Sequence, residues 1–178
     1  MADQKVNDDA SIRTARLEIR PLRAEDATDL AAVANDRRVA ANLRDTFPNP
    51  YTVDDARFWI EQPHEALQGL AIVRDGLVIG AIGLEPGVGE RRFDAELGYW
   101  LGVDHWGQGF ATEAVAALCD HAFATTTLQR LHAMVYDGNP ASDRALKKCG
   151  FVLEGHARRA IFKNGRFLDC RTYVRLKV

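Results

Sequence analysis

The residues best suited to chemistry lie in one stretch in the middle of the chain, from Glu96 to Ala114. An apolar, strand-like segment ends there in a turn that contains Gly107 and Gly109, and a helix-forming segment follows. The first N–H groups of a helix have no partner within the helix, and the helix dipole adds partial positive charge beside them. This order of strand, glycine-containing turn and helix start therefore favours binding of an anion such as a phosphate group.

The turn alone does not identify a ligand. The segment 107–112 lacks the third glycine of a dinucleotide-binding fingerprint, and it lacks the Gly-Lys-Ser/Thr ending of a P-loop. A tight strand-to-helix turn that binds nothing fits these residues equally well. The choice between the two interpretations depends on the rest of the chain.

A second segment further along the chain favours a ligand. The residues from Asn139 to Ser142 precede a helix-forming stretch that ends in the pair Gly150 and Phe151. Together the two segments resemble the GNAT superfamily of acetyl-CoA-dependent N-acetyltransferases. Within it they are most similar to the RimJ/RimL-like branch, which includes ribosomal-protein N-terminal acetyltransferases. The resemblance runs from about Leu17 to the C-terminus.

This resemblance implies an α/β (α+β) GNAT fold: a mixed central sheet of about six to seven strands with splayed central strands, flanked by about four helices. Residues 14–178 would form this single domain, and residues 1–13 a flexible N-terminal arm. Hydrophobic periodicity and turn residues predict a compatible element order. The expected strands are 16–22, 70–74, 77–84, 93–102, 131–136, one opening at 151 and 167–178, and the expected helices are 24–36, 52–62, one from 111 and 141–149.

The resemblance also implies the cofactor site. Acetyl-CoA would be bound and coenzyme A released, with the pyrophosphate held by backbone N–H groups of the turn. Backbone groups of Leu101 and Val103 would pair with the pantetheine arm and polarise the acetyl carbonyl, while the Asn139 side chain would hydrogen-bond the same arm. Glycines at 98 and 102 independently favour a bulge or a close backbone approach in this strand. The full set implied is Leu101, Val103, Trp106, Gly107, Gln108, Gly109, Phe110, Ala111, Thr112 and Asn139. Trp106 stands where many members have Gln or Arg, a departure that this branch often shows.

The acid that protonates the leaving thiolate is not at its usual position. Many members of the family use a Tyr four residues before the Gly-Phe pair, but Leu146 stands there. The RimL-like branch implies instead a serine in the Asn-x-x-Ser segment, which is Ser142. The alternative is that Ser142 only satisfies backbone N–H groups at the start of a helix.

The general base is also displaced. Where a RimL-type enzyme places a glutamate, this chain has Ile161. Glu96 in the central strand is the replacement, acting directly or through a water molecule. The alternative is that Glu96 is a strand carboxylate facing an Arg or Lys. Asp94 points to the same face by strand alternation and is the weaker candidate.

The lack of the usual glutamate base affects which amine the protein is expected to acetylate. Deprotonating an α-amine of pKa about 8 costs roughly 1.4 kcal/mol at pH 7, whereas a lysine amine at about 10.4 costs more than three times as much. A protein or peptide N-terminal α-amine is therefore the expected acceptor. Two alternatives stay open: acetylation of a small amine (polyamine, amino acid, antibiotic or amino sugar), and a catalytically silent acyl-CoA-binding regulatory domain.

Composition narrows the other partners. Of the 178 residues, 47% are hydrophobic and 27% charged, and the net charge of −2 with a pI near 6.2 disfavours nucleic acid. Three scattered cysteines give no metal-ligand spacing, so no metal is expected. The polar start of the chain and its short apolar runs predict a cytoplasmic protein without a membrane partner. A homodimer is an expectation from the family alone.

Overall fold

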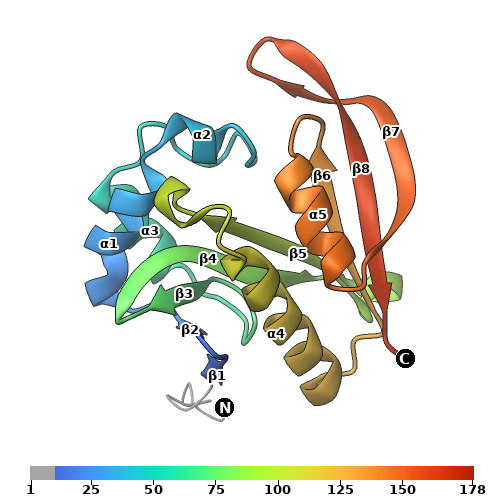
Figure 1. Cartoon of the computed structure of the whole chain (residues 1–178), viewed down its shortest axis with the longest axis horizontal. Helices are drawn as coiled ribbons and strands as arrows, with labels where there is room; N and C mark the ends of the chain where they lie inside the picture. Colours follow the sequence, from blue (N-terminus) through green and yellow to red (C-terminus); the bar gives the residue numbers. More distant parts are fainter. Residues whose placement is uncertain (1–10) are drawn as a thin grey trace.

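The computed structural model describes residues 11–178 as one eight-stranded mixed sheet with five α-helices (Figure 1). The strand order across the sheet is β1-β2-β3-β4-β5-β6-β8-β7. The strands are β1 (Ile12–Arg13), β2 (Glu18–Pro21), β3 (Leu70–Arg74), β4 (Leu77–Pro86), β5 (Asp94–Leu101), β6 (Arg130–Tyr136), β7 (Val152–Lys163) and β8 (Arg166–Leu176). The helices are α1 (Ala27–Ala34), α2 (Arg37–Ala40), α3 (Val53–Glu61), α4 (Phe110–Thr125) and α5 (Pro140–Lys148).

Local sequence signals account for several element boundaries. Thr52 caps α3 by accepting a hydrogen bond from the N–H of Asp55, whose carboxylate accepts one from the N–H of Thr52. The hairpin of β3 and β4 turns at Asp75 and Gly76, and the hairpin of β7 and β8 turns at Asn164 and Gly165, all with positive φ. Both turns have the residue types that two-residue hairpin turns require.

Two hydrophobic clusters cover opposite faces of the sheet. Helices α4 and α5 pack on one face, where Phe110, Leu118 and Leu146 are buried against strand residues such as Ile72 and Leu97. Helices α1 and α3 cover the other face over β3 and β4. Successive side chains of a strand point to opposite faces, so β5 sends Leu97 and Tyr99 toward α4 and α5, and Glu96 and Trp100 the other way.

The sheet opens between β5 and β6. These parallel strands pair only through Asp94, Ala95 and Glu96, although β5 continues to Leu101 and β6 to Tyr136. The predicted splayed central strands are thereby confirmed. The predicted bulge in β5 is wrong, because its pairing with β4 runs without a register shift. Close backbone approach holds at Gly102, where a Cβ would lie 2.8 Å from the Cβ of Val33 on α1.

The structure has more strands and helices than the sequence predicts. The sheet has eight strands rather than six to seven, and α2 brings the α-helices to five. Of the predicted arm, residues 1–10 lie outside the described part of the chain. Its residues Ile12 and Arg13 form strand β1, which pairs with Ile19 and Glu18 of β2. The helix expected over 24–36 begins as a 3-10 turn and ends at Ala34. Such short pieces carry too few residues to show a periodicity.

Across residues 11–178, no helix combines the length and the apolar character needed to cross a membrane.

Candidate active site

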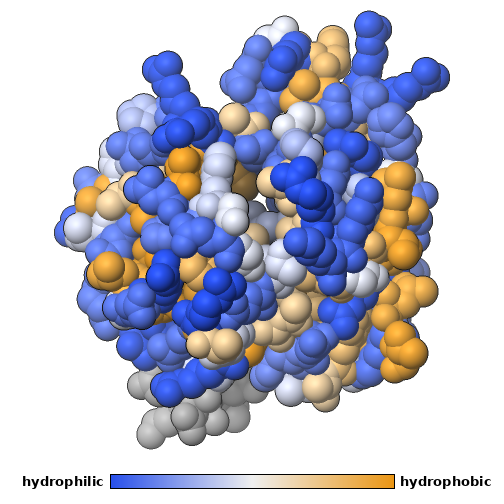
Figure 2. All heavy atoms as spheres, viewed as in Figure 1, coloured by the Kyte–Doolittle hydropathy of each residue, from blue (hydrophilic) through white to orange (hydrophobic). Residues whose placement is uncertain are grey.

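A cleft of about 430 Å³ occupies the gap between β5 and β6. Its walls are the β5 segment Glu96–Leu101, the β6 segment Ala133–Tyr136, the first turn of α4, the start of α5 and the residues after α2. In the space-filling view the surface is hollowed between the α2 side and the side of α5 and the β7–β8 hairpin (Figures 1 and 2). Because the strands separate here, groups from both faces of the sheet reach one cavity.

The turn before α4 has the backbone geometry of an anion cradle. Gly107 and Gly109 have φ of +72° and +84°, a conformation that side chains with a Cβ rarely adopt. Within the described part of the chain, no acceptor pairs with the N–H groups of residues 107 to 112. These free N–H groups at a helix start fit a pyrophosphate, and of their residues all but Gln108 line the cleft.

Most of the cofactor residues implied by the sequence line this cleft. The lining set contains Leu101, Trp106, Gly107, Gly109, Phe110, Ala111, Thr112 and Asn139. Val103 and Gln108 lie outside it. Val103 begins a 3-10 turn and accepts a hydrogen bond from the N–H of Trp106, and the Gln108 side chain donates to the Asp104 carbonyl oxygen. These two residues shape the turn rather than the cavity wall.

Trp106 connects the turn to the end of β5. Its indole Nε1 donates to the Leu101 carbonyl oxygen at 2.8 Å. That carbonyl oxygen therefore has a partner within the protein already. A flexible Gln or Arg at this motif position has no indole ring to fix the turn against the strand in this way. The tryptophan thus has a structural role that the motif comparison alone did not reveal.

A salt bridge supports the cradle from outside. Glu113, in the first turn of α4, accepts hydrogen bonds from the Thr14 hydroxyl (2.6 Å) and the Arg16 N–H (3.0 Å). The Arg16 guanidinium pairs with Glu113 at 2.7 Å, donates to the Gln108 carbonyl oxygen and lies over the Phe110 ring. Burial opposes ionisation of Glu113, but the hydrogen bonds from Thr14 and Arg16 outweigh it and lower the pKa of the carboxyl group. Arg16 thereby neutralises a carboxylate that would otherwise repel a phosphate.

Replacing Arg16 with alanine is expected to raise the KM for acetyl-CoA about tenfold, or about 1.4 kcal/mol, with kcat within about twofold. The loss has two parts, a missing cation and an unpaired Glu113 carboxylate beside the cradle. The double variant Arg16→Ala, Glu113→Gln should therefore recover part of the affinity. Arg57→Ala, which removes an exposed arginine of α3, is the matched control. A double variant weaker than Arg16→Ala alone would contradict this electrostatic account.

Ser142 and Asn139 meet at the start of α5. Asn139 caps the helix by accepting a hydrogen bond from the N–H of Ser142 at 3.2 Å. Among residues 11–178, no backbone group hydrogen-bonds to the Ser142 hydroxyl, which lies 2.6 Å from the Tyr99 hydroxyl of β5. The helix cap is the Asn139 side chain and not the Ser142 hydroxyl. The Ser142 hydroxyl is therefore available to a group bound in the cleft.

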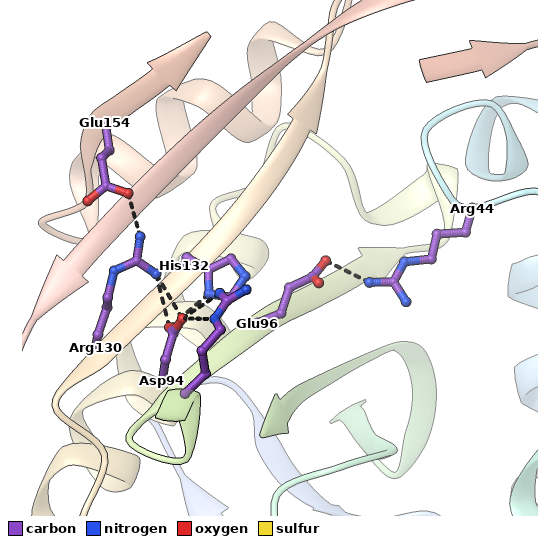
Figure 3. Close-up of polar contacts among 7 residues, drawn as sticks. Arg44, Asp94, Glu96, Arg130, His132 and Glu154 are labelled. Carbon is purple, nitrogen blue, oxygen red and sulfur yellow. Dashed lines mark hydrogen bonds and ion pairs between the residues drawn. The ribbon is translucent and has the colours of Figure 1, made fainter. Parts of the chain in front are cut away.

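Glu96 lies in the cleft and also faces an arginine, as the structural alternative predicts. Its Oε1 is 2.7 Å from Nη2 of Arg44, which comes from the loop after α2 (Figure 3). Both side chains line the cavity. Because Arg44 occupies Oε1 of Glu96, Glu96 can act as a base only when Arg44 moves or shares the carboxylate.

Asp94 has a different environment although it lies on the same face of β5. It contacts Arg91 (2.6 Å), Arg130 (3.0 Å) and His132 (2.9 Å), and Arg130 also contacts Glu154 (Figure 3). Burial opposes its ionisation, yet these hydrogen bonds prevail and lower the pKa of Asp94. Asp94 is thus held by three cationic or polar partners and does not line the cleft.

Sequence reasoning missed several cleft residues. Tyr99 lies in a segment that the sequence shows only as an apolar strand, although strand alternation puts its side chain on the same face as Leu97. Arg144 and Lys148 of α5 line the cleft and add positive charge to it, which helical spacing could have shown. Leu146 lies fully buried in the core, so it offers nothing in place of the usual Tyr.

Comparison with known proteins agrees with this fold and site. Residues 16–152 match the profile of the acetyltransferase (GNAT) domain, and the chain belongs to that family of acetyl-CoA-dependent acyltransferases. An uncharacterized N-acetyltransferase, p20 of Bacillus licheniformis, is 34% identical over 94% of this chain and 96% of its own length.

Two further similar proteins are ribosomal-protein acetyltransferases. The ribosomal-protein-serine acetyltransferase of Escherichia coli is 37% identical over 46% of each chain. The structure of RimL, a ribosomal L7/L12 alpha-N-protein acetyltransferase in complex with coenzyme A, superimposes with a TM-score of 0.83 at 20% identity. That match covers 93% of this chain and 97% of RimL and shows a shared fold.

Proposed function

We propose that this protein transfers the acetyl group of acetyl-CoA to the α-amine at the N-terminus of a protein or peptide. The observation that carries the proposal is the cleft through the sheet, which brings Glu96 from one face and Ser142 from the other into one cavity. Acceptor and cofactor can then enter from opposite sides and meet between β5 and β6. The ribosomal-protein acetyltransferases among the relatives support a protein acceptor.

The cofactor side of the site has a defined set of contacts. The free N–H groups of residues 107–112 would hold the pyrophosphate, with Arg144 and Lys148 adding positive charge. Asn139 and the β5 backbone near Leu101 line the path that the pantetheine arm would take. When bound, acetyl-CoA supplies an activated thioester for a nucleophilic amine.

The proposed base and the proposed acid come from opposite faces of the sheet. Glu96 takes the proton of the incoming ammonium, after the acceptor displaces Arg44 from the carboxylate. The neutral amine attacks the acetyl carbon, and the C–S bond breaks with its electron pair on sulfur. The Ser142 hydroxyl acts as the acid at that sulfur. The nitrogen loses its second proton as the amide forms, and this proton restores the Ser142 hydroxyl, so that the products are the amide and the free thiol of coenzyme A.

An acceptor panel tests this function. Thiol release is measured with a free N-terminal peptide, the same peptide N-acetylated but containing a lysine, spermidine and an aminoglycoside. The free peptide is expected to give the highest kcat/KM, because its α-amine is the cheapest of these amines to deprotonate. A preference for the blocked lysine peptide or for a small amine would reject the proposal. Binding of acetyl-CoA with no thiol release from any acceptor would identify a silent acyl-CoA-binding domain.

A further inference from the structure

The Tyr99 hydroxyl has one partner in the cleft. Its oxygen lies 2.6 Å from Oγ of Ser142, and both residues line the cavity. Within residues 11–178, no other group hydrogen-bonds to the Tyr99 hydroxyl or to the Ser142 hydroxyl. Tyr99 comes from the strand that forms the cleft wall, and Ser142 from the helix start that Asn139 caps. The two hydroxyls are therefore brought together by a sheet strand and the capped start of a helix.

The direction of this hydrogen bond follows from the chemistry of the two groups. Burial raises the pKa of the Tyr99 phenol to about 12, although the contact with Ser142 opposes the rise. The phenol therefore keeps its proton at any working pH, and a phenol is a better donor than an aliphatic alcohol. Tyr99 thus donates to Oγ of Ser142, which leaves the proton of the Ser142 hydroxyl free to point into the cleft.

We infer that Tyr99 is a positioning residue for thiol protonation: its hydroxyl holds Ser142 so that the Ser142 proton faces the departing sulfur. This inference rests on the proposed function of Ser142. A hydrogen bond accepted by Ser142 also strengthens the one that Ser142 donates, because linked hydrogen bonds polarise one another. Tyr99 keeps its own proton throughout, so the only protons that move are those of the amine and of Ser142.

The expected effect is moderate, because a thiolate is already a much better leaving group than an alkoxide or an amide anion. Tyr99→Phe should lower kcat about tenfold at saturating acetyl-CoA, with the KM for acetyl-CoA within about twofold. Ser142→Ala should lower kcat at least as much. The double variant should be no slower than Ser142→Ala, because Tyr99 acts only through Ser142. Tyr51→Phe is the matched control, since Tyr51 is a buried tyrosine of the other face, outside the cleft.

Each result decides between distinct conclusions. If Tyr99→Phe keeps kcat within twofold while Ser142→Ala is slow, the inference is wrong and the role of Ser142 stands. If the two losses multiply in the double variant, Tyr99 acts independently of Ser142 and the inference is also wrong. If Ser142→Ala keeps full kcat, the acid assignment fails and the inference with it. A rise in KM with unchanged kcat would show that Tyr99 only shapes the cofactor site.

Discussion

Replacing Glu96 with glutamine is expected to lower kcat/KM for a peptide acceptor by about 100- to 1000-fold at pH 7, the range typical of a lost general base. Glutamine keeps the shape of the side chain and its contact with Arg44, but it cannot accept the ammonium proton. The measurement is thiol release at saturating acetyl-CoA across pH 6 to 9.5. The KM for acetyl-CoA should stay within twofold, because the cradle lies at the far end of β5 from Glu96.

The pH dependence distinguishes a base from a merely structural carboxylate. An α-amine of pKa about 8 is increasingly neutral above that pH, so the need for a base declines and the gap between the two enzymes should narrow. Glu85→Gln is the matched control, because Glu85 pairs directly with Glu96 across β4 and β5 but does not line the cleft. A loss that is the same at every pH, or a loss below twofold, would show that Glu96 serves only as the partner of Arg44.

The turn that we propose as the cofactor cradle was predictable from the sequence because it depends on backbone. Glycines with positive φ and a free helix start are encoded by adjacent residues, so Gly107, Gly109 and the first turn of α4 could be placed without knowing the fold. The side-chain contacts of this turn were not predictable in the same way. Arg16 reaches Glu113 across 97 positions, and Trp106 bonds a carbonyl oxygen of the preceding strand.

The acceptor side was harder to predict because it is assembled from distant segments. Glu96, Arg44 and Tyr136 come from β5, the loop after α2 and β6. A second cavity of about 210 Å³ adjoins this region, lined by Arg44, Tyr136 and residues 160–163 of β7. There the buried Lys163 pairs with Asp45 at 2.7 Å. No local sequence pattern links the β7–β8 hairpin to the loop after α2. Glu96 could therefore be proposed from the sequence, but the residues around it could not.

The Asp94 cluster is expected to hold β5 and β6 together where their pairing begins. Asp94 and Arg130 are register partners in the first of the three pairs, and the strands separate after the third pair, which Glu96 forms with His132. Asp94→Asn removes the charge that Arg91, Arg130 and His132 share, and leaves these groups poorly matched in a half-buried site. The free energy of unfolding should fall by about 2 to 3 kcal/mol. For a domain of this size, the Tm should fall by about 5 to 10 °C.

The stability loss should depend on pH in a defined direction. The pKa of Asp94 is lowered in the folded state, so its contribution is complete above the unfolded pKa of about 3.9 and disappears as the pH falls through the lower folded value. Urea unfolding should therefore show the full difference between wild type and Asp94→Asn at pH 6 to 8, and a shrinking one below about pH 4. Asp54→Asn is the matched control, because its pair with Arg57 is exposed and worth less than about 1 kcal/mol. An equal difference at pH 7 and pH 3.5 would mean that the substitution acts through packing. In that case the ion cluster would not be what closes the sheet at the base of the cleft.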